Sequence, residues 1–391
     1  MTRPVSSSIG SFDHQPRTRI VFGVDSIEQL GKLAVEIGAK RALLVTDPGI
    51  VLAGHADRVR KLLEGAGVTV SVFDKALENP TTRCVDDCLG LAKAERPDTI
   101  IGLGGGSAMD TAKGCNFLLT NGGRMQDYRG IGKASKPMLP LIAIPTTAGT
   151  GSECQSAALI VDEHTHQKMA CLDPKAAARI AILDPQLTLS QPPRVTACAG
   201  MDAIAHALET AVATRRNPLS MMYSREAFHL CIKAFAEVIT HPKDIEARGR
   251  MLLGAALAGL AIENSMLGAA HAAANPLTAH FGIVHGQAVG LMLPHVIRFN
   301  AQGADSRNAY NKLAVVGELT SSHHNHAPEP LIERIEALLD LAKMPRRIKD
   351  SADSKKLALL ADEASRQWTA SFNPRPVSRD DFIQLYEAAL K

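Results

Sequence analysis

The segment DTIIGLGGGSAMDTAKG, residues 98–114, runs from an apolar stretch through three consecutive glycines into a helical pattern. The apolar stretch predicts a buried strand, and a helix is expected to begin near Ser107. Glycine lets a pyrophosphate approach the backbone, and the start of a helix offers it unpaired N–H groups and a positive dipole end. A tight strand-to-helix turn without a ligand has the same pattern. The segment predicts an α/β fold, with a candidate phosphate site at Gly104, Gly105 and Gly106.

On both sides of this segment, from residue 17 to about 190, β-rich runs alternate with helical stretches. The β-rich runs are RTRIVFG, RALLVTD, VTVSVFD, LIAIPTT, ALIVDE and ARIAILDP. The helical stretches include SIEQLGKLAVEIGA, ADRVRKLLEGAG and VDDCLGLAKAE. Strands that alternate with helices are typical of a parallel sheet covered by helices.

The second half of the chain has a different pattern. After Ser190 it is rich in Ala and Leu with helical periodicity, as in VTACAGMDAIAHALETAVA and EARGRMLLGAALAGLAIEN. The segment LDPQLTLSQPP, with its paired prolines, marks the boundary. We predict an α/β domain over 1–190 and an all-helical domain over 191–391, and the 46% hydrophobic content suffices for two cores.

Composition and charge restrict the class of protein. The chain has 43 Lys and Arg against 40 Asp and Glu, a net charge of +3, so nothing favours nucleic acid or an anionic membrane as partner. The N-terminus lacks the apolar stretch of a signal peptide, and no segment has ~20 uninterrupted apolar residues. The seven cysteines are expected to be reduced and packed. We expect a cytoplasmic protein, with a solvated loop at SSHHNHAPEP, residues 321–330.

A second candidate ligand loop is IPTTAGTGSE, residues 144–153, which also follows an apolar run and carries the hydroxyl groups of Thr146, Thr147 and Thr150. It could be an ordinary connecting loop. Two such loops at successive strand ends favour a ligand site, because open α/β sheets bind ligands at the carboxyl ends of their strands.

Asp47 ends the β-rich run RALLVTD. An acidic side chain at this place in an α/β sheet can hydrogen-bond the adenosine ribose of NAD and would repel the extra phosphate of NADP. It can equally be a turn aspartate before Pro48. The spacing leaves both interpretations open.

A candidate metal site comes from the helical half. Asp202 and His206 are four apart in GMDAIAHALE, hence on one helical face, although such pairs are commonly structural. His271 lies in a nearly uncharged, Ala-rich stretch, and His285 precedes a glycine. Imidazoles in apolar surroundings need a partner, which a cation shared with Asp202 would supply. Such a set would bind Fe²⁺ or Zn²⁺ and leave room for a substrate oxygen.

The motifs GGGSAMDTAK, PTTAGTGSE and GMDAIAHALE, followed by the segment from His271 to His285, occur in the order found in one family. The sequence resembles the iron-containing (group III) alcohol dehydrogenases from about residue 17 to the C-terminus. The resemblance implies a dinucleotide-binding domain, a helical metal-binding domain and commonly a homodimer. It also implies hydride transfer between NAD(H) and a small alcohol or aldehyde.

Site residues carry over to the matching positions of this chain. The metal ligands, for Fe²⁺ or alternatively Zn²⁺, would be Asp202, His206, His271 and His285. The cofactor would lie against Asp47, Asn79, Gly104, Gly105, Gly106, Ser107, Asp110, Thr146, Thr147, Thr150, Lys168 and Leu187. For Asn79, Lys168 and Leu187 this assignment depends on the resemblance alone.

The chain departs from the family pattern at one position. Many members have a second histidine four residues after the third ligand, where this chain has Asn275 in ANPLT. Asparagine can hydrogen-bond but cannot titrate near neutral pH. Either protons leave through the cofactor ribose and water, or His280 takes the role, or the substrate differs from the typical one. Asn275 and His280 are thus the candidate catalytic residues.

The sequence leaves three alternative functions to be weighed. The first is a polyol oxidation like that of glycerol dehydrogenase, with Zn²⁺. The second is a synthase of the dehydroquinate type. Such an enzyme would require a pocket rich in Lys and Arg for an acidic, phosphorylated substrate, and the Ala-rich metal segment argues against it. The third is an NAD-binding protein without catalysis, which the intact ligand set disfavours.

Overall fold

The computed structural model describes residues 11–165, 167–320, 328–348 and 354–390. The first ten residues of the N-terminus and residues 321–327 of the predicted polar loop lie outside this part. All seven cysteines lie in the described residues, are buried and form no disulfide bond, as expected for packed thiols. Among the described residues, no helix is both long enough and apolar enough to cross a bilayer.

The first half of the chain forms a parallel sheet of six strands in the order β1-β9-β6-β4-β2-β3. These strands are β1 (Arg19–Phe22), β2 (Arg41–Val45), β3 (Thr69–Phe73), β4 (Thr99–Gly104), β6 (Leu141–Pro145) and β9 (Ile180–Leu183). All pairings in this sheet are parallel. Every residue of β4, β6 and β9 is buried, which explains their continuous apolar runs, because helices cover both faces of such a sheet.

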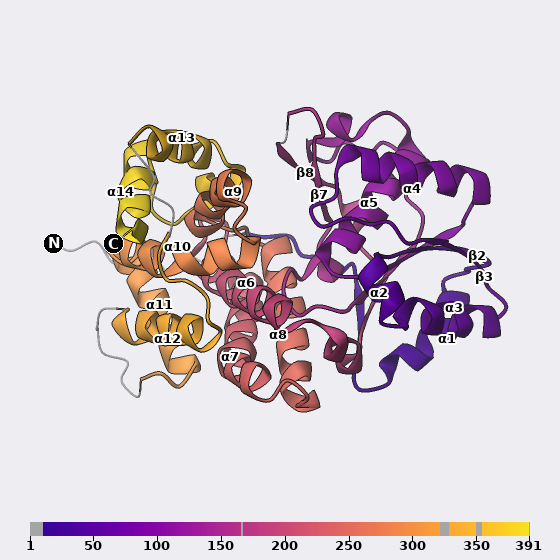
Figure 1. Cartoon of the computed structure of the whole chain (residues 1–391), viewed down its shortest axis with the longest axis horizontal. Helices are drawn as coiled ribbons and strands as arrows, with labels where there is room; N and C mark the ends of the chain where they lie inside the picture. The colour runs from indigo at the N-terminus through magenta and orange to yellow at the C-terminus, as the bar shows by residue number, and fades with distance from the viewer. Residues whose placement is uncertain (1–10, 166, 321–327, 349–353, 391) are drawn as a thin grey trace. The chain divides into compact units, whose positions relative to one another are not determined.

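Two groups of helices cover the sheet (Figure 1). They are α1 (Leu30–Glu36), α2 (Pro48–Leu52), α3 (His55–Gly65), α4 (Thr82–Glu95) and α5 (Gly106–Asn121). Helices α4 and α5 pack together over one core cluster, and α1 and α3 pack together over another. The predicted α/β fold with a parallel sheet is therefore confirmed.

A second, smaller sheet was not anticipated. Its strands are β5 (Gly130–Ile131), β7 (Ala157–Val161) and β8 (Lys168–Leu172), in the order β5-β8-β7. The run ALIVDE belongs to this sheet and not to the parallel one, because β7 and β8 pair antiparallel and only residues 162–167 separate them in sequence. So short a connection can join antiparallel neighbours, whereas parallel strands need a long crossover.

The second half is helical, as predicted. Its helices are α6 (Pro193–Val212), α7 (Pro218–Thr240), α8 (Ile245–Glu263), α9 (Ala269–Phe281), α10 (His285–Asn300), α11 (Ala304–Val316), α12 (Glu329–Leu341), α13 (Ser354–Ser365) and α14 (Arg379–Leu390). Short 3₁₀ helices are η1 (Ser26–Gln29), η2 (Met125–Tyr128), η3 (Ser152–Cys154), η4 (Pro174–Ala176), η5 (Pro185–Ser190) and η6 (Trp368–Phe372). No strand follows β9 among the residues that the structure describes.

Residue contacts divide the chain into two units. One is Arg17–Ala203 with Lys233–Gly259, and the other is Met1–Pro16 with Ile204–Ile232 and Leu260–Lys391. Helix α6 contributes to both units. The domain boundary predicted at residue 190 falls between β9 and α6, where the chain changes from strands to helices.

Candidate functional site

The strand order creates a candidate ligand position at the carboxyl ends of β2 and β4. The chain leaves β2 toward β3 at one edge of the sheet, and leaves β4 toward β6 on the other side. Connections that diverge from neighbouring parallel strands open a crevice above the sheet, which is where ligands of such folds bind. Asp47 follows β2 and the three glycines follow β4, so both predicted features belong to this position.

Gly104 must be glycine for two reasons. Its φ of +141° lies in a region that other residues rarely adopt, and a Cβ there would lie 2.9 Å from the Cβ of Ala108. That Cβ would also lie 3.1 Å from Oδ2 of Asp47, which places Asp47 directly beside the turn. Asp47 caps α2 by accepting the Ile50 N–H through Oδ1 at 3.1 Å. It is therefore a turn aspartate, and it is also a neighbour of the glycine turn.

The second predicted loop lies against the first. A Cβ on Gly106 would be 2.8 Å from Cγ2 of Thr150, and a Cβ on Gly105 would be 3.3 Å from Cγ2 of Thr147. The Thr146 N–H donates to the Gly104 carbonyl at 2.9 Å. The glycine turn and the threonine loop thus form one continuous surface at the N-terminus of α5.

Asn79, Ser107 and Lys168 are far apart in sequence but lie together in the structure. The Asn79 N–H donates to Oγ of Ser107 at 3.2 Å, and Nζ of Lys168 donates to Oδ1 of Asn79 at 3.1 Å. Asn79 has a φ of +51°, which asparagine tolerates better than most residues. Although Lys168 is exposed overall, desolvation lowers its pKa, and the negative charges of Asp110, Asp202 and Glu78 oppose this shift. Lys168 is thus part of the cluster and not an isolated surface charge.

Asp110 lies on α5 beside the same loop. Its Oδ1 accepts a hydrogen bond from Oγ of Ser152 at 3.2 Å. Burial raises the pKa of Asp110 to about 6, while the positive charges of Lys113 and Lys168 oppose the shift. Leu187, by contrast, is only 1% exposed and packs in the core, so its predicted contact with a cofactor stays a prediction.

Lys113 was missed by the sequence interpretation. It is fully buried, and its Nζ donates to the carbonyl groups of Ser152, Gln155 and Ala157 at 2.7 to 2.9 Å and to Oγ of Ser152 at 3.0 Å. One side chain therefore holds the segment that continues the threonine loop. Its position three residues after Asp110 on α5 was the available signal, because residues three apart share a helix face.

We expect Lys113→Met to lower the free energy of unfolding by about 3 kcal/mol, because the apolar side chain leaves buried carbonyl groups without a donor. Urea-induced unfolding of the variant and the wild type measures this loss. Lys93→Met, which changes an exposed lysine on α4, is the matched control and should stay within about 0.5 kcal/mol of the wild type. Equal stability of the two variants would contradict the anchoring role.

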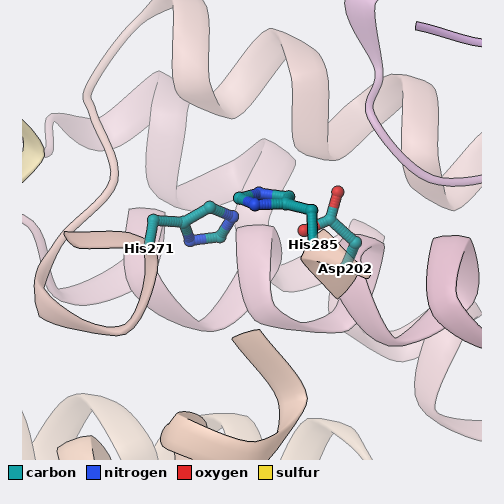
Figure 2. A group of neighbouring side chains, drawn as sticks. All are labelled: Asp202, His271 and His285. Carbon is teal, nitrogen blue, oxygen red and sulfur yellow. The ribbon is translucent and has the colours of Figure 1, made fainter. Parts of the chain in front are cut away.

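Three of the predicted metal ligands come together. The ligand atoms of Asp202 on α6, His271 on α9 and His285 at the start of α10 all lie within 4.8 Å of one another (Figure 2). Asp202 and His271 are buried and His285 is partly exposed. Nitrogen and oxygen ligands about 2.1 Å from a tetrahedral ion lie about 3.4 Å apart. The group is therefore close to the spacing that a divalent ion requires, and its donor types suit zinc or iron.

His206 lies beside this group but is not one of the three. It is one helical turn after Asp202 and is 4% exposed. Its ring stacks on that of His271, with centroids 4.8 Å apart and planes 19° apart, and the rings of His271 and His285 have centroids 5.4 Å apart. His206 is in position to extend the set to four ligands, and that role stays a prediction.

Glu209 is a second residue that the sequence interpretation missed. Its Oε2 lies 2.5 Å from Nδ1 of His271, and both side chains are buried. Glu209 is the last residue of the motif GMDAIAHALE, seven positions after Asp202 and therefore on the same face of α6. A residue that binds a ligand's ring but does not touch the metal has no ligand spacing in the sequence to reveal it.

The two candidate catalytic residues differ in their surroundings. Asn275 follows His271 by one turn of α9, and its Nδ2 donates to Oε1 of Gln367 at 3.0 Å. Nε2 of His280 lies 2.9 Å from Oε2 of Glu363. Nine residues at about 100° each place His280 on the side of α9 opposite His271. This geometry favours Asn275 over His280 as the neighbour of the metal group.

The fold and these side chains define a protein with an α/β unit suited to a dinucleotide and a candidate divalent-metal site on helices. Residues 16–185 match the family model "Iron-containing alcohol dehydrogenase", and residues 196–390 match "Fe-containing alcohol dehydrogenase family, C-terminal". The chain belongs to the iron-containing alcohol dehydrogenase family, a family of oxidoreductases, which confirms the resemblance.

Full-length relatives agree with this assignment. The chain is 35% identical to Alcohol dehydrogenase 4 of Schizosaccharomyces pombe, over 95% of this chain and 87% of that protein. It is 32% identical to the NAD-dependent methanol dehydrogenase of Bacillus methanolicus, over 95% of this chain and 97% of that protein. A crystal structure of 1,3-propanediol oxidoreductase superposes with a TM-score of 0.93 at 29% identity, over 97% of this chain and 100% of that one.

Proposed function

We propose that this protein is a metal-dependent oxidoreductase that transfers hydride between NAD(H) and a small alcohol or its aldehyde. The observation that carries the proposal is the group of Asp202, His271 and His285, within 4.8 Å of one another in a chain of this family. The relatives named for alcohol and methanol dehydrogenation support the reaction type.

The cofactor in this proposal is NAD(H), bound at the surface of the glycine turn and the threonine loop. The N-terminus of α5, a helix of 16 residues, would face the pyrophosphate with its free N–H groups and dipole. Asp47 beside Gly104 would accept hydrogen bonds from the ribose and disfavour NADP. Lys168 and Asn79 would complete the surface near Ser107.

Asp202, His206, His271 and His285 would hold the metal, proposed as Fe²⁺. When bound, the ion supplies positive charge that lowers the pKa of a substrate hydroxyl and polarises a carbonyl group. By holding the ion, these residues would orient a substrate oxygen, and Asp202 and His271 are themselves buried. Asn275 can orient a substrate through hydrogen bonds, but its side chain holds no exchangeable acid proton near neutral pH.

A second candidate is the oxidation of a polyol such as glycerol with Zn²⁺. Catalytic zinc sites usually have three protein ligands and one open position. The group of three, with His206 outside it, fits that description. A cytoplasmic location and a homodimer complete the proposal for either reaction.

The test uses metal-stripped protein reconstituted anaerobically with Fe²⁺ or Zn²⁺. We expect oxidation of NADH with short aldehydes and hydroxyaldehydes that depends on the added metal, with NADPH much less effective. Oxidation of glycerol with Zn²⁺ and not with Fe²⁺ would favour the second candidate. Metal-independent turnover, or tight NADH binding without turnover of any substrate in the panel, would overturn the proposal.

A further inference from the structure

The N-terminus of α9 is held by side chains from other parts of the chain. The N-cap residue is Gly268, which has no side-chain oxygen to accept the first N–H groups of the helix. Oδ1 of Asn373 accepts the Ala269 N–H at 3.2 Å, and Oε1 of Glu209 accepts the Ala270 N–H at 2.7 Å. Two separate side chains thus cap neighbouring positions, and His271 is the next residue.

Gly268 makes this double cap possible. A Cβ at Gly268 would lie 2.9 Å from Oδ1 of Asn373 and 3.1 Å from Oε1 of Glu209. Asn373 is fixed in turn by Asn300, because Nδ2 of Asn373 donates to Oδ1 of Asn300 at 2.7 Å. Asn373 is therefore held in place by a residue other than Glu209.

The second oxygen of Glu209 has a different partner. Oε2 lies 2.5 Å from Nδ1 of His271, and the side chains of His271 and Glu209 are 4% and 3% exposed. A carboxylate at this distance fixes the hydrogen on Nδ1 and leaves the lone pair on Nε2. Figure 2 shows one ring nitrogen of His271 on the side of His285, where the candidate ligand atoms gather.

We propose that Glu209 is a positioning residue for the metal centre, which binds the backbone of α9 with one oxygen and orients His271 with the other. The Nε2 lone pair of His271 then faces Asp202 and His285. Glu209 itself touches neither metal nor substrate. This inference rests on the proposed metal-dependent function.

A purely structural role of Glu209 predicts a different outcome. If Glu209 only capped α9, removing the neighbouring cap at Asn373 would disturb the metal centre to the same extent. Asn373 binds the same helix end but has no contact with His271 in the described hydrogen bonds. Asn373→Ala is therefore the matched control.

The test compares Glu209→Gln and Asn373→Ala with the wild type, as full-length apo-protein. Glutamine keeps the volume but offers one acceptor oxygen where two donors, the Ala270 N–H and Nδ1 of His271, need one each. We expect Glu209→Gln to bind Zn²⁺ 10- to 100-fold more weakly in chelator competition, the size typical for outer partners of metal ligands. Asn373→Ala should bind Zn²⁺ within about threefold of the wild type. We expect this even if its melting temperature falls as much as that of Glu209→Gln.

The outcomes separate the two proposals. Wild-type Zn²⁺ affinity in Glu209→Gln, or an equal loss in Asn373→Ala, overturns the positioning role and leaves the proposed function intact. A wild-type protein that binds no divalent ion overturns the proposed function, and the positioning role falls with it. If Glu209→Gln does not fold, ¹⁵N histidine NMR of the wild-type apo-protein decides, with His271→Gln to assign the signal. Hydrogen on Nδ1 supports the proposal, and hydrogen on Nε2 overturns it.

Discussion

His271→Ala is expected to abolish tight metal binding and to lower metal-dependent turnover by about 10³-fold or more, because it removes one of the three candidate ligands that lie together. The variant also leaves the buried carboxylate of Glu209 without its imidazole partner. Metal binding is measured as the metal content of protein purified from cells grown in iron- or zinc-supplemented medium. Turnover is measured as NADH oxidation.

The matched control for this prediction is His229→Ala. His229 lies on α7, is partly buried and binds the Val316 carbonyl group through Nδ1 at 3.0 Å. Its hydrogen-bond partner belongs to α11 (Ala304–Val316), which carries none of the four predicted ligands, so its loss should leave metal content unchanged. NADH binding provides a second control, because the proposed nucleotide surface contains no residue of α9. Full activity of His271→Ala would show that the metal centre is elsewhere or that the reaction needs no metal.

Local sequence patterns predicted the features that depend on neighbours along the chain. The apolar runs identified all six strands of the parallel sheet, and Gly104 to Gly106 identified the turn before α5, because a turn with φ of +141° needs glycine. The spacing of Asp202 and His206 likewise predicted a common face of α6. These properties follow from helix and strand periodicity and from the backbone freedom of glycine.

Contacts between distant positions account for what was missed. Glu209 and His271 are 62 positions apart, and Lys113 reaches the carbonyl of Ser152 across 39 positions. A buried lysine or glutamate has no local signature, since its partners come from other elements of the fold. The second sheet was missed for the same reason, because β5 pairs with β8 across the intervening strands β6 and β7. Periodicity can indicate a strand but not the sheet to which it belongs.

Gly259→Ala is expected to destabilise the protein by about 3 kcal/mol or more, at the upper end of what overpacking costs. Gly259 lies on α8, and a Cβ there would be 2.3 Å from the carbonyl oxygen of Gly151. The atom that it meets belongs to the backbone, so no side chain can rotate away. Gly151 cannot retreat freely either, because its φ is +62° and its own Cβ position lies 2.6 Å from the Ala255 carbonyl oxygen.

This close approach also fixes the threonine loop, because Gly151 directly follows Thr150, whose side chain lies against Gly106. Gly259→Ala should therefore weaken NADH binding in whatever fraction of the protein folds, whereas Lys93→Met should not.

The matched control for the loss of stability is Gly90→Ala on α4, where a Cβ would meet nothing within 4 Å. There alanine should stabilise the helix by about 0.5 to 1 kcal/mol, because it only removes the flexibility of glycine. Urea unfolding of the two variants should thus shift in opposite directions, and a stabilised Gly259→Ala would mean that α8 and the threonine loop do not pack backbone to backbone.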